Sequence, residues 1–426
     1  MNRYLYSFLW HLALPLVGLR LLWRARKQPE YLHHLGERLG ASPRAGSQPR
    51  LWVHAVSVGE TRAAQPLIKA LLAQYPEHEI LLTHMTPTGR ATSLELFSKE
   101  PRVLCCYLPY DLPWAQHRFL SRSRPLIGVV METEVWPNLL QAARRSNIPV
   151  LLINARLSER SARGYQRLGT FGQQAFSDFT RVLAQTAADA GRLAACGARS
   201  PEICGNVKFD VELAPKLLAL GDEFRAAAKS RPIILAASTR EGEEEDLLAA
   251  FTRHAAPETL LVLVPRHPQR FSEVAGLVEK AGLGLQRRSE KLDIAPDTRV
   301  WLGDSMGEMV AYYRMCDVAI IGGSWQPLGG QNLIEACAAG KPVLVGPHTF
   351  NFTEAANKAI EAGAAQRCDN LDAALATSMR WLADSATRQN MGEAGLQFTA
   401  ANRGAVRHIL SAVSAIVPAG EAVRDL

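Results

Sequence analysis

Short apolar runs alternate along most of the chain with segments in which apolar residues recur at helical spacing. Nearly continuous apolar runs with helices between them are typical of parallel strands that are covered on both faces. The pattern therefore predicts an α/β protein built on parallel sheets. Its predicted strands are residues 51–58, 79–84, 103–108, 126–131, 150–154, 181–185, 201–205, 232–238, 259–265, 299–303, 318–323 and 342–346.

The alternation stops between residues 211 and 229, which are predicted to form a polar linker and one helix. A chain of 426 residues is long enough for two or three domains. We therefore expect an α/β domain over 50–210 and a second α/β domain with C-terminal helices over 230–426. Two doubly wound domains facing each other across a cleft would bind ligands beyond the carboxyl ends of their strands.

Residues 1–27 differ from the rest of the chain. Residues 4–19 carry no formal charge and are followed by Arg20 and a basic run at 24–27. Sixteen helical residues span about 24 Å, and counting through Trp23 brings the length close to that of a bilayer core of about 30 Å. We expect a membrane anchor, either single-pass or lying in the interface, with a soluble packing helix as the alternative. Because the basic residues follow the apolar segment, the body should lie on the cytoplasmic side.

The net charge of +7 is concentrated in the same region. Eight Lys and Arg and two acidic residues give the first 50 residues a charge of +6, which leaves +1 for the remaining 376. A nucleic-acid enzyme would carry a basic stripe on its folded body, so we expect no nucleic-acid partner. The seven cysteines form no CxxC pair and have no metal-like spacing with histidine, which indicates a reducing compartment and no metal site or cofactor.

Ionisable residues follow the predicted strands of the N-terminal half. Glu60 comes after the first strand in the sequence SVGE, where a helix N-terminus should keep its carboxylate ionised, as a base requires. Glu132 and Glu134 follow the fourth strand in METEVWPN, and Lys208 lies in GNVKFD. The alternatives are that Glu60 caps its helix and that the METE carboxylates form a capping pair. As a lone residue, Lys208 is weak evidence for an anion site.

Glycine-rich turns that open helices are concentrated in the C-terminal half. Their backbone N–H groups can approach an anion, and helix N-termini favour phosphate. Arg266, next to His267, adds a guanidinium fork suited to phosphate. No Walker A loop occurs, and no GxGxxG follows the first strand. This half is therefore predicted to hold a nucleotide-type phosphate, with turns that bind no ligand as the alternative.

Taken in order, these motifs resemble one family closely: the bacterial 3-deoxy-D-manno-octulosonic acid (Kdo) transferases of lipopolysaccharide synthesis. The resemblance runs from the N-terminal segment to about Phe352 and more loosely beyond it. It is carried by WVHAVSVGE, METEVWPN, NARLSERSARGY, GNVKFD, ASTREGEEE, LVPRHPQRF, GDSMGEM, GGSW…GGQNLIEA and GPHTFNF.

The resemblance implies a GT-B glycosyltransferase on the cytoplasmic side of the inner membrane. It would move Kdo from CMP-Kdo to a lipid A precursor (lipid IVA), with inversion and without a metal. In the family's pattern Glu60 is the general base, and Glu132, with Glu134 as its rival, and Lys208 act at the transition state. The residues implied to bind CMP-Kdo are Ser238, Thr239, Arg266, His267, Gly307, Glu308, Met309, Gly330, Gln331, Asn332, Leu333, Ile334 and Glu335.

The chain departs from the family's pattern at Gln331, where many members have histidine. A glutamine can form hydrogen bonds but cannot carry a proton's charge.

Two alternatives to a Kdo transferase remain open at this point. One is another nucleotide-sugar transferase or an epimerase on the same fold, because fold does not fix function. The other is a membrane protein that binds a nucleotide sugar without catalysis.

Overall fold

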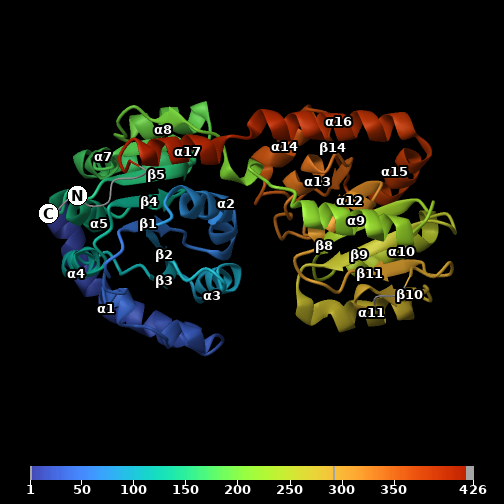
Figure 1. Cartoon of the computed structure of the whole chain (residues 1–426), viewed down its shortest axis with the longest axis horizontal. Helices are drawn as coiled ribbons and strands as arrows, with labels where there is room; N and C mark the ends of the chain where they lie inside the picture. Colours follow the sequence, from blue (N-terminus) through green and yellow to red (C-terminus); the bar gives the residue numbers. More distant parts are fainter. Residues whose placement is uncertain (1, 291–292, 419–426) are drawn as a thin grey trace. The chain divides into compact units, whose positions relative to one another are not determined.

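The computed structural model describes residues 2–290 and 293–418. Within these residues the chain forms two compact units, each built on a parallel seven-stranded sheet (Figure 1). The N-terminal unit comprises Met1–Asp210 together with Arg403–Leu426, and the C-terminal unit comprises Val211–Asn402. The predicted α/β fold with two parallel-sheet domains is confirmed.

The sheet of the N-terminal unit has the strand order β3-β2-β1-β4-β5-β6-β7. Successive side chains of a strand point to opposite faces, so Leu51 and Val53 enter one apolar core and Trp52 enters the other. Two buried faces explain why the strands are continuous apolar runs rather than alternating ones. The strands are β1 Arg50–His54, β2 Glu79–His84, β3 Val103–Tyr107, β4 Ile127–Met131, β5 Val150–Ala155, β6 Arg181–Ala184 and β7 Glu202–Ile203.

Helices cover both faces of this sheet. The core on one face includes residues of α2, α3 and α17, and the core on the other includes residues of α4 to α8. The α-helices of the unit are α1 Arg3–Ala25, α2 Val58–Gln74, α3 Pro87–Leu96, α4 Pro113–Ser123, α5 Pro137–Arg145, α6 Glu159–Arg167, α7 Thr170–Ser177, α8 Ala187–Ala195 and α17 Ala405–Ser414. Short 3₁₀ turns are η1 Pro29–Leu32, η2 Glu37–Leu39 and η3 Val207–Phe209.

Helix α17 changes the predicted domain boundaries. The sequence places all residues after 230 in the C-terminal domain, but α17 packs on the N-terminal unit beside α2 (Figure 1). Ile409 and Val413 are buried in the core that α2 covers. Asp210 accepts hydrogen bonds from the backbone N–H groups of Gly404 and Val406 at 2.6 Å each and so caps the start of α17. The apolar face of α17 is buried on this unit, and the C-terminal domain ends at about residue 402.

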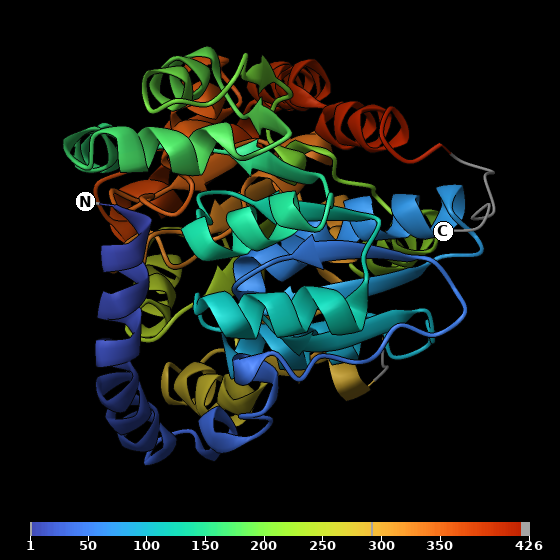
Figure 2. The same ribbon diagram turned by 90° about the vertical axis from the view of Figure 1, so that its left-hand side faces the viewer.

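Helix α1 lies along the side of the N-terminal unit (Figure 2). Tyr6 donates a hydrogen bond to Asp111 at 2.9 Å, and the Trp10 ring lies 6.4 Å from the ring of Trp136. No residue of α1 is fully buried, and the exposed ones include Leu16, with 68% of its surface accessible. By length and composition α1 could cross a membrane, which fits the predicted anchor.

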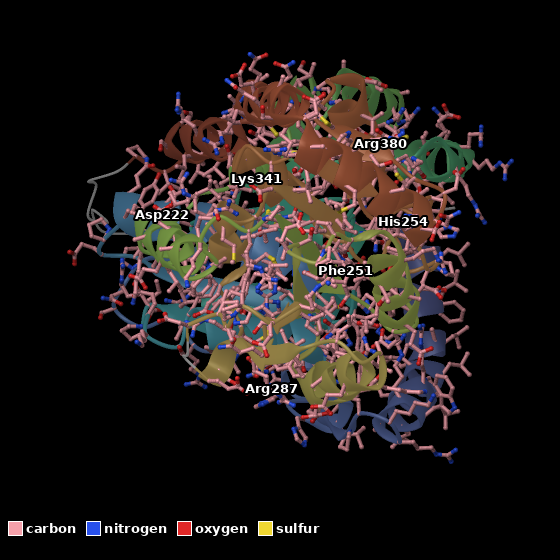
Figure 3. All side chains as sticks on the ribbon, turned by 90° about the vertical axis from the view of Figure 1, so that its right-hand side faces the viewer. Asp222, Phe251, His254, Arg287, Lys341 and Arg380 are labelled. Carbon is pink, nitrogen blue, oxygen red and sulfur yellow. The ribbon has the colours of Figure 1, made fainter. Side chains whose placement is uncertain are left out.

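The C-terminal unit has the strand order β10-β11-β9-β8-β12-β13-β14, and its neighbouring strands are parallel. Helix α10, with Phe251 in the core and His254 at its end, packs against α15, which carries Arg380 (Figure 3). The strands are β8 Ile233–Thr239, β9 Leu260–Pro265, β10 Leu285–Arg287, β11 Val300–Leu302, β12 Val318–Ile321, β13 Val343–Val345 and β14 Ala365–Arg367. The helices are α9 Pro215–Ala227, α10 Glu244–His254, α11 Phe271–Lys280, α12 Met309–Met315, α13 Ile334–Ala338, α14 Thr353–Glu361, α15 Leu371–Ala383 and α16 Ser385–Asn402, with the 3₁₀ turns η4 Pro268–Arg270 and η5 Arg288–Glu290.

Candidate functional site

The strand order places the candidate residues at the switch point of each sheet. In the N-terminal unit the order reverses between β1 and β4, which are neighbours, and the loops after these strands diverge. Glu60 follows β1, and Glu132 follows β4. In the C-terminal unit the reversal lies between β8, which has Ser238 near its end, and β12, which the glycine turn 322–332 follows. Ligands of doubly wound sheets bind at such points.

Glu60 occupies the third position of α2 and forms a capping box with Ser57. The Ser57 backbone N–H donates to the Glu60 carboxylate at 2.8 Å, and the Glu60 N–H reaches the Ser57 hydroxyl at 3.5 Å. Each residue satisfies a backbone group that the helix end would leave unpaired. The capping interpretation is therefore confirmed. It does not exclude catalysis, because one carboxylate oxygen remains outside this box.

The helix end does not keep the pKa of Glu60 low. Burial is the largest influence on this carboxyl group and raises its pKa from 4.5 to about 7, and the nearby charge of Glu132 adds to the rise. The hydrogen bonds from Ser57 act in the opposite direction and are outweighed. A carboxylate with a pKa near neutrality is a better proton acceptor than an ordinary one, and it still ionises at physiological pH.

The two METE carboxylates have different partners. Glu132 follows β4 in a left-handed backbone conformation with φ of 58°, which is rare outside glycine, and lies 3.3 Å from the Nε of Arg156. Glu134 accepts a hydrogen bond from the Trp136 indole at 2.8 Å, and burial raises its pKa. Neither carboxylate caps α5, whose N-cap is Trp136 without a side-chain cap. The capping-pair alternative is wrong.

Lys208 lies in η3, a turn that packs against α2. Its backbone N–H donates to the Asn206 side chain at 3.0 Å, and the preceding N–H, of Val207, donates to Asn154 at 3.1 Å. Asn154 itself is fully buried, with φ of 49° at the end of β5. These side chains fix the turn that carries Lys208 on the same unit as Glu60 and Glu132.

In the C-terminal unit a buried carboxylate shapes the glycine turn after β12. Glu243, with 2% of its surface exposed, accepts hydrogen bonds from the N–H groups of Gly323 at 2.7 Å and Trp325 at 3.0 Å. It also accepts one from the N–H of Arg240 at 3.0 Å. Glu243 thus joins the loops that follow β8 and β12. In the sequence Glu243 is only the first residue of an acidic run, 243–246, and nothing there marks its role in the turn.

Arg266 and Gln331 meet beside this turn. The Arg266 Nε donates to the Gln331 side-chain oxygen at 3.2 Å, and the Arg266 N–H donates to the Thr239 carbonyl at 3.0 Å. Ser238 adopts φ of 57°, another strained conformation at a strand end. Burial lowers the pKa of His267, and the charges of Arg240 and Arg266 lower it further. The structure therefore brings Thr239, His267 and Gln331 together around the guanidinium-bearing Arg266, and Ser238 precedes Thr239 at the end of β8.

The other predicted donor contacts occupy helix starts. Glu308 precedes Met309 of α12 and accepts from Ser305 at 2.6 Å and from Arg288 at 3.2 Å, while Gly307 has φ of 79°. Asn332 donates to Glu335 at 3.0 Å and accepts from the N–H of Ile334 at 3.0 Å. Leu333 and Ile334 are buried at 1% and 0% exposure, so their side chains belong to the core. The Gly330 N–H donates to the Gly323 carbonyl at 2.7 Å.

Comparison with known proteins identifies the family of the chain. Residues 33–211 match the family described as "3-Deoxy-D-manno-octulosonic-acid transferase (kdotransferase)", and residues 245–398 match "Glycosyl transferases group 1". The chain is 46% identical to the 3-deoxy-D-manno-octulosonic acid transferase of Bordetella pertussis, covering 97% of this chain and 99% of the relative. It is 38% identical to that of Haemophilus influenzae, covering 96% and 97%. Its fold is similar to the crystal structure of Acinetobacter baumannii MurG, with a TM-score of 0.56 at 14% identity, covering 86% of this chain and 99% of that one.

Proposed function

The chain belongs to the family of 3-deoxy-D-manno-octulosonic acid (Kdo) transferases, and we propose that it transfers Kdo from CMP-Kdo to a lipid A precursor such as lipid IVA. Kdo transfer itself follows from family membership. The donor nucleotide, the acceptor, inversion at the anomeric carbon and independence from a metal are the proposed parts.

The observation that carries the proposal is the environment of Glu60. Burial and the charge of Glu132 raise its pKa to about 7 at the switch point of the N-terminal sheet. In the proposed reaction Glu60 removes the proton from an acceptor hydroxyl, whose oxygen then attacks the anomeric carbon of Kdo. The bond to the CMP phosphate breaks on the opposite face of the sugar, and a single displacement of this kind inverts the anomeric centre.

The leaving group needs a positive charge near it, and Arg266 supplies one in the C-terminal unit. CMP-Kdo carries one negative charge on its phosphate and one on its sugar carboxylate, and charge grows on the departing phosphate oxygen. Preorganised donors stabilise such charge without reorganising during the reaction. Arg266, held by Gln331, supplies such a donor. Gln331 supports Arg266 without a charge of its own, so this arrangement does not need an imidazole at that position.

Helix α1 supports a lipid acceptor. Its exposed apolar side chains include Leu12 at 59% and Leu19 at 63% exposure, while Tyr6 holds the start of the helix to Asp111. We place α1 in the inner membrane as a single-pass or interfacial anchor, with the basic run 24–27 toward anionic lipid and the body on the cytoplasmic side.

A donor-binding experiment tests the nucleotide. CMP should raise the melting temperature of the purified full-length protein, and UDP at the same concentration should not, because ligands that bind only the folded state stabilise it. Stabilisation by UDP alone would contradict the proposed donor.

A further inference from the structure

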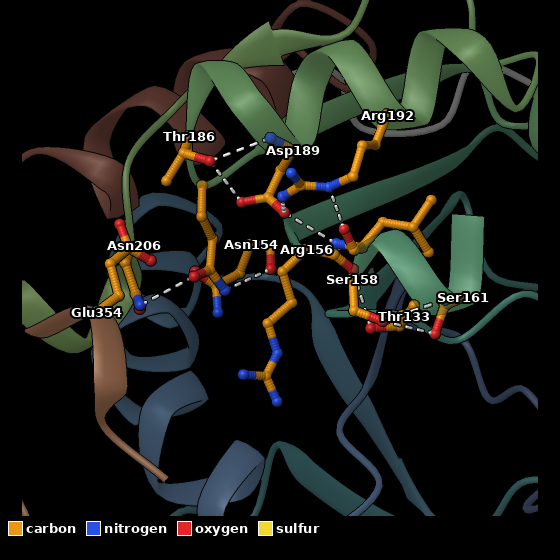
Figure 4. A network of polar contacts seen from close by, with 12 residues as sticks. Thr133, Asn154, Arg156, Ser158, Ser161, Thr186, Asp189, Arg192, Asn206 and Glu354 are labelled. Carbon is orange, nitrogen blue, oxygen red and sulfur yellow. Dashed lines mark hydrogen bonds and ion pairs between the residues drawn. The ribbon is translucent and has the colours of Figure 1, made fainter. Parts of the chain in front are cut away.

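The end of β5 and the loop after it, residues 154–158, are held at several backbone positions (Figure 4). The Thr133 hydroxyl donates to the Arg156 carbonyl at 3.0 Å. The Leu157 N–H donates to Asp189 at 2.9 Å, and the Leu157 carbonyl accepts from the Arg192 guanidinium. Both backbone groups of Leu157 and the carbonyl of Arg156 are therefore fixed by side chains from other elements.

The residues that hold the loop are themselves fixed. Asp189 is buried with 6% of its surface exposed, accepts from the Thr186 hydroxyl at 2.6 Å, and pairs with Arg192 at 2.7 Å. On the other side of the loop, Gln185 donates to the carbonyl of Asn154 at 2.9 Å. These hydrogen bonds fix the backbone position of Arg156, which lies between Asn154 and Leu157.

The side chain of Arg156 contrasts with this fixed backbone. It is 56% exposed, and among residues 2–290 and 293–418 its ion-pair partner is Glu132, at 3.3 Å from its Nε. By comparison, the structural Arg50 is 1% exposed and pairs with Glu79 at 2.5 Å. Arg156 thus presents a guanidinium to solvent from a rigid loop, next to the candidate site.

We propose that Arg156 binds an oxyanion of the acceptor, a phosphate or carboxylate close to the hydroxyl that receives Kdo. The inference rests on the proposed function and adds a contact for the acceptor. An arginine fork binds phosphate and carboxylate through two parallel hydrogen bonds. Arg156 pairs with Glu132, which follows β4, and Glu60 follows the neighbouring strand β1, so Arg156 and Glu60 lie at the same edge of the sheet. Because the backbone of Arg156 is already fixed, binding an anion costs less conformational entropy.

The binding of the acceptor anion also bears on Glu132. The anion competes with Glu132 for the Arg156 guanidinium, since both are negatively charged. Acceptor binding and the Glu132–Arg156 pair are therefore coupled, and the neutral variant Glu132→Gln should bind acceptor more tightly than the wild type.

The test is steady-state kinetics with the full-length protein in detergent, varying the acceptor at saturating CMP-Kdo. Arg156→Gln should raise the acceptor KM by about 10- to 100-fold, the usual effect of losing a charge-assisted hydrogen bond, with the donor KM unchanged. Arg156→Lys keeps the charge without the guanidinium fork, so its acceptor KM should lie between those of the wild type and Arg156→Gln. Arg163→Gln on α6, whose side chain is 64% exposed, is the matched control and should behave as wild type.

Treating the acceptor with phosphatase identifies the oxyanion. If it is a phosphate, the treatment raises the KM of the wild type but not that of Arg156→Gln. If it is a carboxylate, the treatment changes neither. An unchanged acceptor KM for Arg156→Gln, or a rise in the donor KM alone, would overturn the inference. A wild type that transfers no Kdo would instead contradict the proposed function.

Discussion

Replacing Glu60 by glutamine separates its two roles, because glutamine can keep the capping box and cannot act as a base. The glutamine side-chain oxygen can accept the Ser57 N–H as the carboxylate does at 2.8 Å. We expect turnover to fall about 10²- to 10⁴-fold, the usual contribution of a general base, and CMP binding to stay unchanged.

The stability of the variant follows from the pKa of Glu60. Burial raises that pKa from 4.5 to about 7, so between these pH values the folded protein holds a proton that the unfolded chain has lost. The stability of the folded state therefore falls as the pH rises from 4.5, and the loss is complete above about 7. At about 1.4 kcal/mol per pKa unit this loss is at most about 3–4 kcal/mol. Glu60→Gln carries no such charge and should be at least as stable as the wild type at pH 8.

Two measurements on one preparation test this reasoning: turnover at saturating substrates and the melting temperature at pH 8. Glu60→Ala removes both the base and the cap, so it should lose about 1 kcal/mol relative to Glu60→Gln as well as activity. Glu159→Gln, at an exposed position in the first turn of α6, is the matched control and should change neither quantity. Turnover of Glu60→Gln within a few-fold of the wild type would refute the role of Glu60 as the base and leave it as a helix cap.

Further predictions concern the pH profile, the donor and the anchor. The kcat of the wild type should rise with pH through about 7 as Glu60 loses its proton. Glu132→Gln should move this rise in kcat to lower pH, because it removes a negative charge that raises the pKa of Glu60. Glu134→Gln should move the rise by a smaller amount. Arg266→Ala should weaken CMP binding by calorimetry about 10- to 100-fold and leave the acceptor KM unchanged, since we propose that its guanidinium binds the donor phosphate. Equal affinity would remove Arg266 from the donor site. Deleting residues 1–27 should give a folded, more soluble protein with poor activity on membrane-embedded acceptor, and complete sedimentation with membranes would contradict the anchor assignment.

Much of the fold could be predicted from the sequence, because parallel strands that are buried on both faces need continuous apolar runs. The strands that escaped prediction are β10, with the sequence LQR, and β14, with the sequence AQR. Both lie at the edges of the C-terminal sheet and contribute only three residues each, so they lack the apolar length that marks a central strand. The return of α17 to the N-terminal unit also has no local signal, because any amphipathic helix can pack on either unit.

The candidate site could be located from the sequence but its electrostatics could not. The sequence placed Glu60, Glu132 and Lys208 after strand ends, and in the structure they follow β1, β4 and β7. The raised pKa of Glu60 depends on burial and on Glu132, which lies far away in the sequence. Arg156 lies in the motif NARLSERSARGY. Its exposed side chain and fixed backbone could not be predicted, because Asp189 and Thr133, which hold the loop, lie elsewhere in the sequence.

The central claim is that this protein transfers Kdo from CMP-Kdo to a lipid A precursor. It is tested most directly by mass spectrometry of the lipid after incubation with purified full-length protein and CMP-Kdo, beside a parallel reaction with Glu60→Gln. We predict that the wild type increases the mass of the acceptor by one or more Kdo residues with release of CMP, and that the variant forms far less product. An acceptor of unchanged mass in the presence of bound CMP-Kdo would contradict the account.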